Sequence, residues 1–389
     1  MVASTNLTSS AYDKETIFGV TDANPVFTLL PTTGGGIANN ISTAISDVIR
    51  SDRQTDDLVV VDGDIAGDIN FELSYAPYAD FMASVLMNAA TPRTISLSTV
   101  TNNGTVDSTI IENAGIEAVI QTGDVFSLSS ATDPTIDGVY TCIATGTNQV
   151  TVSPDTEATT NLTDLVVTST SIQTNGASPI DGYTFRKKVT NNGSNFYWYH
   201  RGCAINTMSL KFATGSILSG TFGIIGMTEE VRSTPLTGEG ADNPVPSYSI
   251  LNAVSSIAVI RISGIVGGTA TFSTLDLNID NKIAPAKSIG KLGAGALAAY
   301  SLDVNGSTEV YFDNLDLYNK FVAATSFGVT IILTDGDGNS IGIDMPYCKF
   351  ESLDTPISGK DAFLMQSGSF KALRDPTLDY MIKFSRVDA

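Results

Sequence analysis

The sequence is poor in the residues that most catalytic and metal sites need. It has a single histidine, His200, in 389 residues. This argues against a histidine-based catalytic triad, a multi-histidine zinc site and a histidine proton relay, although a site made only of carboxylates remains open. Asp and Glu are plentiful, but no pattern pairs two of them as general acid and general base. The sequence gives no positive indication of an enzyme, and we expect no catalytic residue, cofactor or metal.

Cysteine and long hydrophobic runs are also scarce. Cys142, Cys203 and Cys348 lie far apart and form no C-x-x-C motif, which indicates buried or free thiols in a reducing compartment. Residues 1–10 are polar, without a cationic segment followed by an apolar one, so we expect no signal peptide. No run of about 18 apolar residues occurs, so we expect no membrane-spanning segment.

Charge is sparse but one-sided. Charged residues make up 16% of the chain, well below the ~25% of an average soluble domain. The 41 acids outnumber the 21 bases, which gives a formal net charge of -20. A protein that grips nucleic acid by its phosphates needs a positive surface, so this balance argues against that class. It remains compatible with a protein that must avoid sticking to nucleic acid.

Short alternating runs predict a mainly β protein. Thr, Val, Ile and Ser recur with period two between Gly, Asn and Asp, as in residues 68–74, 138–144 and 329–334. Helical patterns are rare, and the two best candidates are residues 77–89 and 315–325. At 389 residues, the chain is long enough for two or three domains.

The two predicted helices belong to an internal repeat. Both carry the pattern Tyr-x-x-Phe-x-Ala, which begins at Tyr78 and at Tyr318, and the strand before each begins with a glycine, Gly67 or Gly306. Further strands follow each helix, near 183–189, 196–213 and 216–227 in the first half and near 327–335, 340–353, 362–372 and 378–387 in the second. A chance likeness between two amphipathic helices is the alternative, but the shared order of strand, turn and helix favours a duplication.

The repeat suggests a division of the chain. Three alternating strands between the first helix and the strand near 183 predict a small β unit inserted at an exposed loop, on the outer surface. A segment rich in Pro, Gly and acids near 233–246 predicts a linker. We therefore expect an N-terminal arm without a core of its own (1–36), a discontinuous first domain (37–90 and 172–232), the inserted unit (91–171), a linker (233–250) and a second domain (251–389).

Three local patterns look functional but favour structural explanations. Gly34-Gly-Gly36 lacks the lysine and spacing of a phosphate-binding loop. Asp335-Gly-Asp-Gly-Asn339 resembles the start of a calcium loop, but it lacks the later glycine and glutamate and is better explained as a hairpin turn. The aromatic run beside His200 could form a stacking platform for sugars or bases, but a subunit contact is favoured because aromatic residues are enriched at interfaces: Phe196, Tyr197, Trp198 and Tyr199.

Several motifs occur in one order along the chain. In the first half they are Ile49-Arg-Ser-Asp-Arg-Gln54, the Gly67 strand, the Tyr78 helix, and the segments 202–212 and 220–226; in the second half they are segments 275–281, 317–321 and 345–348. In this order they resemble the major tail tube proteins of long-tailed, siphovirus-like bacteriophages. The resemblance covers about 40–90 and 180–389. It does not cover residues 1–36, and it covers the inserted unit only loosely.

The resemblance implies two tandem tail-tube-type β-sandwich or barrel domains, each with one flanking helix. Rings of such domains pair strands around a channel and stack into a tube through which DNA passes. Two domains in each chain imply a trimeric ring with pseudo-six-fold symmetry, and a hexameric ring stays open if only one half lines the channel. The implied location is the virion tail, assembled in the host cytoplasm, and the implied partners are the tape measure, tail tip and terminator proteins.

The acidic balance then suggests a lining that repels DNA phosphates, so that DNA passes without specific binding. The candidate lumen-facing acids are Asp56, Asp57, Asp62, Asp64, Asp68, Asp303, Glu309 and Asp313. The alternative function is a β-rich adhesin or carbohydrate-binding module of a tail tip or surface structure, supported by the aromatic run and the Ser/Thr/Gly-rich strands.

Overall fold

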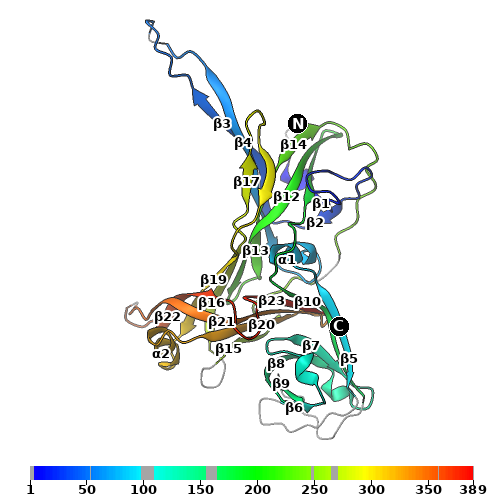
Figure 1. The fold of residues 1–389 in the computed structure, drawn as a ribbon, viewed down its shortest axis with the longest axis vertical. Helices are drawn as coiled ribbons and strands as arrows, with labels where there is room; N and C mark the ends of the chain where they lie inside the picture. Colours follow the sequence, from blue (N-terminus) through cyan, green and yellow to red (C-terminus); the bar gives the residue numbers. More distant parts are fainter. Residues whose placement is uncertain are drawn as a thin grey trace.

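The computed structural model describes residues 4–52, 54–97, 109–154, 164–246, 249–263, 270–357 and 359–388. It is mainly β, as predicted, with two α-helices among these residues. The molecule is elongated (Figure 1): a long hairpin projects from one end, a small β unit lies at the other, and a broad sheet lies between them. Parts of the expected inserted unit, residues 98–108 and 155–163, lie outside the described residues.

The first repeat is built from strands that follow one another in space in the order β3-β4-β13-β12-β11-β1-β2. The single helix α1 packs against β12. A further strand, β14, continues β13 along the edge of β12. The bounds are β1 Thr8–Lys14, β2 Thr28–Leu30, β3 Gly34–Ile45, β4 Leu58–Glu72, α1 Ala79–Leu86, β11 Tyr183–Asn191, β12 Ser194–Ala213, β13 Ser219–Gly226 and β14 Thr228–Arg232.

The second repeat has the same topology. Its strands follow the order β16-β19-β22-β21-β20-β15, α2 packs against β21, and β23 pairs with β21 as β14 pairs with β12. A separate hairpin of β17 and β18 follows β16. The bounds are β15 Ile257–Ile262, β16 Phe272–Asp280, β17 Ala284–Lys287, β18 Ala294–Ala298, β19 Asp303–Tyr311, α2 Asp316–Val322, β20 Phe327–Thr334, β21 Ser340–Asp354, β22 Met365–Ala372 and β23 Lys383–Val387.

Matching irregularities support the duplication. A bulge at Asn206 interrupts the pairing of β12 with β13, and a bulge at Glu351 interrupts that of β21 with β22 at the corresponding place. Bulges are specific local features, so their recurrence makes a chance likeness a poor explanation. The glycines that lead the two repeated strands are also equivalent, because Gly67 pairs with Ile37 and Gly306 pairs with Leu277.

Gly306, at the start of the repeated strand in the second half, is required by the packing around it. A Cβ on Gly306 would overlap the ring of Phe370, which lies on the neighbouring strand β22. In the first repeat a ring also covers a glycine across the equivalent strand pair, but the strands exchange roles: a Cβ on Gly220 of β13 would overlap the ring of Phe71 on β4. An aromatic ring thus covers a bare stretch of backbone in each repeat, which buries apolar area without steric strain.

The two repeats share one continuous sheet and one core. Residues 207–213 of β12 pair antiparallel with residues 274–280 of β16, which joins the sheet of the first repeat to that of the second. One hydrophobic cluster extends from the aromatic residues around α1 to the apolar residues of β20 and β21. The junction between the repeats is therefore a packed interface within the chain, not a flexible hinge.

The region between α1 and β11 forms a small β unit with its own core. Its strands are β5 Thr91–Leu97, β6 Thr109–Glu112, β7 Val125–Ser129, β8 Gly138–Gly146, β9 Gln149–Ser153 and β10 Leu165–Thr174, with short 3-10 helices η2 Ile116–Ala118 and η3 Pro134–Ile136. Its apolar cluster is separate from the main core. The separate core supports the proposed inserted unit. In sequence this unit interrupts the first repeat, but in space its strand β10 pairs with β23 of the second repeat.

A buried ionic cluster fixes this unit against the second repeat. The Lys383 ammonium lies 2.8 Å from the Asp124 carboxylate of the inserted unit, and the Arg93 guanidinium lies 2.6 Å from the other oxygen of that carboxylate. The second carboxylate of the cluster, Asp344, accepts a hydrogen bond from Tyr380. Burial acts to raise the pKa of Asp124, but Lys383 and Arg93 bring that pKa below its ordinary value.

The structure corrects the expected arm at 1–36. A short 3-10 helix, η1 Thr5–Leu7, leads into β1, which pairs along its whole length with β11. Ala11 and Phe27 are buried in a cluster with Tyr197 and Tyr199. Residues 8–30 are therefore attached to the sheet and share a buried cluster with β12, because β11 offers an edge that the alternating residues of β1 can cover. The expected linker is likewise attached in part, since Arg186 pairs with Glu239 and Asp242.

Candidate assembly edges and channel-lining face

One face of β4 is largely polar from Asp62 to Glu72. Asp62, Asp64 and Asp68 alternate with the buried Ile65 and Ile69. Because side chains alternate across a strand, the three carboxylates point away from the core and share one face. Within β4, the alternation therefore puts these acids on the side opposite Ile65 and Ile69.

This polar face continues across the junction between the repeats. Directly paired residues point to the same side of a sheet, and pairing connects Asp68 through β13, β12 and β16 to Asp303 on β19. The sets of paired residues on either side of this one are also polar, and they extend across β22 to β21. Acids outnumber lysines on this face. The acids are Asp62, Asp64, Asp68, Glu72, Asp276, Asp280, Asp303, Glu309 and Asp354, and the lysines are Lys211, Lys349 and Lys371.

The face is hollowed where the two repeats meet. A shallow pocket of about 410 Å³ lies over β12, β16, β19 and β22 and is lined mainly by small polar side chains, among them Ser209, Asn278, Asn305, Ser307 and Ser369. Leu210 and Leu277 also line this pocket, together with the charged residues Lys211, Asp276 and Glu351. The pocket is therefore a shallow depression of mixed polar, charged and apolar character.

Lysines neutralise part of the acidic charge. Lys287 of β17 forms ion pairs with Asp62 and Asp64, and its hydrogen bond lowers the pKa of Asp62. Lys371 and Lys282 form ion pairs with Asp303 at 2.7 and 3.4 Å, and the hydrogen bond from Lys371 lowers the pKa of that carboxyl. Asp62 and Asp303 therefore stay ionised at neutral pH.

Five of the eight candidate lumen acids lie on this one face: Asp62, Asp64, Asp68, Asp303 and Glu309. The other three lie elsewhere. Asp56 and Asp57 belong to the projecting β3–β4 hairpin, where Asp56 pairs with Arg50, and Asp313 is exposed in the turn before α2. The sequence reasoning missed Asp276 and Asp280, although the alternation along β16 that places them was visible.

The aromatic run 196–199 divides between two faces of β12. Tyr197 and Tyr199 stack on each other in the cluster with Phe27, and the Tyr199 hydroxyl donates to Glu239 at 2.6 Å. Trp198 is half-buried under the Lys187 ammonium, and Phe196 is exposed. The chain itself covers the two tyrosines, which leaves Phe196 and Trp198 as candidates for a subunit contact.

Among the strand edges without a partner in the described part of the chain, two occupy the places that correspond to the β12–β16 junction. The strand β3 pairs only with β4, and residues 349–354 of β21 pair only with β22. In the first repeat the corresponding second half of β12 is paired on both sides, with β13 and with β16. An unpaired row of backbone N–H and C=O groups is a template for pairing with another chain.

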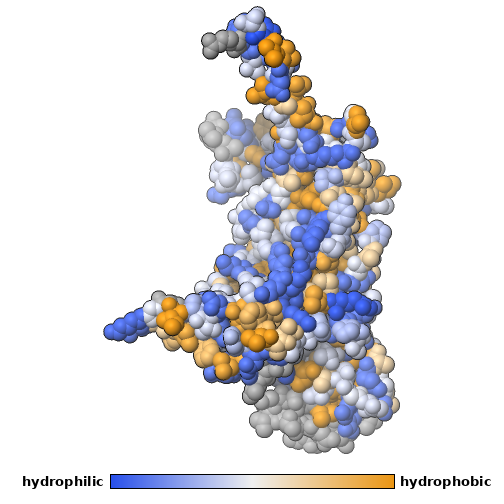
Figure 2. Space-filling model, turned by 60° about the vertical axis from the view of Figure 1, so that its left-hand side comes forward, coloured by the Kyte–Doolittle hydropathy of each residue, from blue (hydrophilic) through white to orange (hydrophobic). Residues whose placement is uncertain are grey.

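The β3–β4 hairpin also presents an exposed apolar surface. It extends beyond the body of the molecule, and Figure 2 shows apolar atoms on it at the top of the view. The Ile49 side chain is 99% exposed, an arrangement typical of an interaction site and unfavourable for an isolated surface. The exposed apolar residues of the hairpin are Ile41, Ile45, Val48, Ile49, Leu58, Val59, Val60 and Val61.

The remaining candidate motifs have structural roles. The Asp335 carboxylate accepts hydrogen bonds from the backbone of Asp337 and Asn339, as expected for the predicted hairpin turn. His200 is buried beside Glu229 at 2.9 Å, and burial lowers the pKa of its ring. All three cysteines are buried and free, as predicted.

The residues that the structure describes contain no cluster of metal-ligating side chains, and none of their helices has the length and apolar character to cross a membrane. A comparison with curated proteins gave no match. A comparison with protein-family models matched residues 5–372 to the model described as phage tail tube protein. The match spans both repeats and the inserted unit. The chain therefore belongs to the phage tail tube protein family, whose members are structural components of the virion tail.

Proposed function

We propose that three copies of this chain close into a ring of six repeats, that rings stack into the tail tube, and that DNA passes through the channel during ejection. The observation that carries the proposal is the junction between the repeats. Within one chain, the second half of β12 pairs with β16, and the equivalent edges at the two ends of the repeat pair, β21 and β3, are left without a partner. A heterologous contact that repeats around an axis closes into a ring when its rotation divides a full turn, and three copies divide it into steps of a third.

The polar face is the proposed wall of the channel. A ring in which β3 of one copy follows β21 of the next extends the sheet without an edge, as closed barrels do. The face that carries the acids lies opposite the apolar core, so one side of this sheet is hydrated throughout. DNA phosphates are repelled by it, and counterion-release binding does not hold the DNA in place. We propose no catalytic role for the protein.

The projecting hairpin is the proposed contact between stacked rings. Its apolar residues lie outside the core of their own chain, and their burial would contribute roughly 25 cal/mol per Å² of apolar surface covered. The tail tube family implies assembly with other tail proteins, and we propose that the tape measure, tail tip and terminator proteins cap or fill the tube.

Electron microscopy of the purified protein, at concentrations that favour assembly, tests the proposal. We expect rings or tubes with a central hole, three-fold averages that resemble six-fold ones, and a mass of three chains for each ring. A compact monomer at all concentrations would contradict self-assembly. A ring of six chains would show that only one of the two repeats lines the channel.

A further inference from the structure

The junction between the two repeats is a template for the contact between chains. This inference rests on the proposed ring of three chains, and it identifies the residues that meet where one chain contacts the next. Counting from the equivalent bulges at Asn206 and Glu351, residues 207–212 of the pairing strand β12 correspond to residues 352–357. Counting from the equivalent glycines, the pairing strand 274–280 of β16 corresponds to residues 34–40 of β3.

One residue pair shows a large difference between the two equivalent places. Phe212 and Ile357 both lie six residues after their bulges. Phe212 is 2% exposed, because β16 and the residues before β15 cover it, whereas Ile357 is 88% exposed. In the first repeat, neighbours within the same chain cover Phe212. The described residues provide no such cover for Ile357 at the equivalent place in the second repeat.

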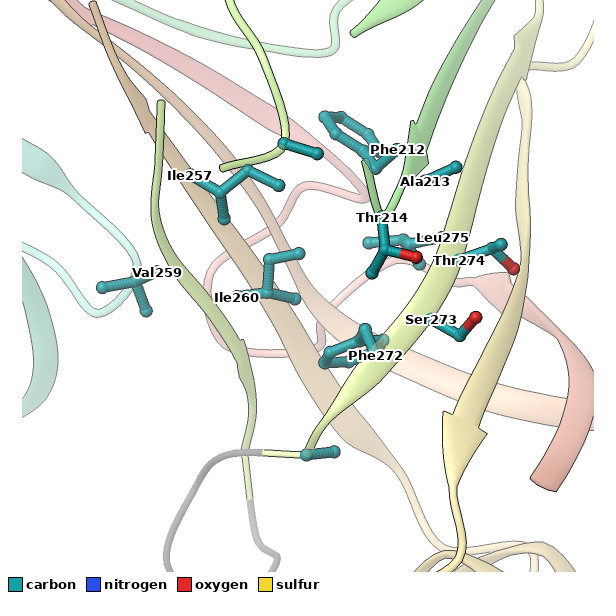
Figure 3. A pocket seen from close by; sticks show the side chains of 12 residues that line it. Phe212, Ala213, Thr214, Ile257, Val259, Ile260, Phe272, Ser273, Thr274 and Leu275 are labelled. Carbon is teal, nitrogen blue, oxygen red and sulfur yellow. The ribbon is translucent and has the colours of Figure 1, made fainter. Parts of the chain in front are cut away.

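The structure also contains the corresponding receiving site. Beside Phe212 lies a hollow of about 390 Å³ between β15 and β16, and Figure 3 shows Phe212, Ile260 and Phe272 around it. The first repeat has a hollow of about 530 Å³ at the equivalent place, between β1 and β3. Its lining combines Gly34–Gly36 and the apolar residues Ile37, Ile69 and Phe185 with polar residues, among them Thr8, Ser10, Thr33 and His200. Three successive glycines leave room there for a side chain from outside.

We propose that Ile357 of one copy enters this glycine-lined hollow of a second copy, while residues 352–355 of the first pair antiparallel with residues 37–40 of the second. The internal junction sets the pairing. Because Ser209 pairs with Asn278 and Thr207 pairs with Asp280, Asp354 lies opposite Ala38 of the second copy and Ser352 lies opposite Asn40. The polar side chains of both strands then stay on the channel face.

A designed disulfide tests the pairing. The double variant Asp354→Cys/Ala38→Cys places two thiols on directly opposite residues, within reach of an S–S bond. The three native cysteines are buried. After mild oxidation of assembled protein, we expect covalent dimers and trimers on a non-reducing gel. The matched control, Asp354→Cys/Ile45→Cys, puts the second thiol on the same edge seven residues further along and should give none.

A substitution at Ile357 tests the hollow independently. Its side chain is exposed in the single chain, so Ile357→Asp should leave the melting temperature unchanged. Burying an isoleucine contributes ~1.5–3 kcal/mol, so we expect Ile357→Asp to raise the concentration needed for ring assembly about tenfold or more. Ile357→Val should stay close to wild type, as should Val254→Asp, which changes an exposed residue outside the hollow.

The experiments distinguish an error in the residue-level contact from an error in the proposed ring. If wild-type rings form while the Asp354→Cys/Ala38→Cys pair gives no cross-link, or while Ile357→Asp assembles normally, the residue-level contact is wrong and the ring stands. If the wild-type protein forms no rings at all, the proposed function itself is wrong.

Discussion

At the residue scale, the buried cluster around Lys383 has a large expected effect on stability. Its ammonium is the cation between the buried carboxylates of Asp124 and Asp344, at 2.8 and 4.0 Å. Replacing Lys383 by Met removes the cation that Asp124 and Asp344 share and leaves Arg93 paired with Asp124, and breaking a buried pair costs about 3–5 kcal/mol. We expect a lower urea midpoint for Lys383→Met and earlier proteolysis of the inserted unit.

The exposed pair between Arg374 and Asp379 provides the control. Both side chains are largely exposed, and such pairs contribute about 0–1 kcal/mol. Arg374→Met should therefore shift the urea midpoint very little. A shift as large as that of Lys383→Met would show that burial of the charges is not the cause.

Asp124 also predicts a dependence on pH. Its pKa is lowered in the folded chain, so its contribution is present above the unfolded value near 3.9 and is lost as pH falls through the folded value. The pKa of Asp344 is raised by burial, which acts in the opposite direction. We expect the melting-temperature gap between wild type and Asp124→Asn to be widest near neutral pH and to narrow in acid. A constant gap from neutral to acid would contradict this.

At the element scale, the two helices differ in how deeply their phenylalanines are buried. Phe81 of α1 is fully buried among Tyr12, Tyr183 and Phe222, whereas its counterpart Phe321 of α2 is half-exposed. Phe81→Ala should destabilise the chain by ~3–5 kcal/mol, and Phe321→Ala should cost clearly less. Thermal unfolding of the unassembled protein measures both, and equal losses would contradict the packing difference.

The β3–β4 hairpin gives a second prediction for an element. Val48 and Ile49 lie at its far end and are exposed in the single chain, so the double variant Val48→Asp/Ile49→Asp should fold normally. If the hairpin joins stacked rings, this variant should form rings but few long tubes in electron micrographs. Normal tube lengths would exclude these two residues from the stacking contact, and loss of the rings would assign them to the ring itself.

At the scale of the whole molecule, the polar face should control how DNA moves. The double variant Asp68→Lys/Glu309→Lys adds positive charge to the proposed channel wall in both repeats. We expect tubes to assemble, DNA ejection to slow, and DNA binding to appear at low salt and weaken as salt rises. The same change of charge in the inserted unit, Glu112→Lys/Asp137→Lys, should leave ejection unchanged. Equal ejection rates for both variants would exclude the acidic lining.

The sequence predicted the elements well because period-two alternation and one helical motif are local signals. Strands β11, β12, β20 and β21 and both helices lie where the pattern placed them. The segment 1–36 was misinterpreted because its composition is polar, and burial of Ala11 and Phe27 depends on distant residues of β11 and β12. No local pattern could show that β12 pairs with β16, or that Lys383 meets Asp124.

By itself, the sequence determined the β-rich class, the duplication, the acidic balance and the likeness to tail tube proteins. Each of these depends on residue order and composition, which local propensity and periodicity express directly. Only the tertiary structure decided which acids share a face, which strand edges are left unpaired, and that Phe212 is covered while Ile357 is bare. The reason is that strand pairing brings together residues far apart in the chain, and a register that sets faces and edges exists only once the strands have paired.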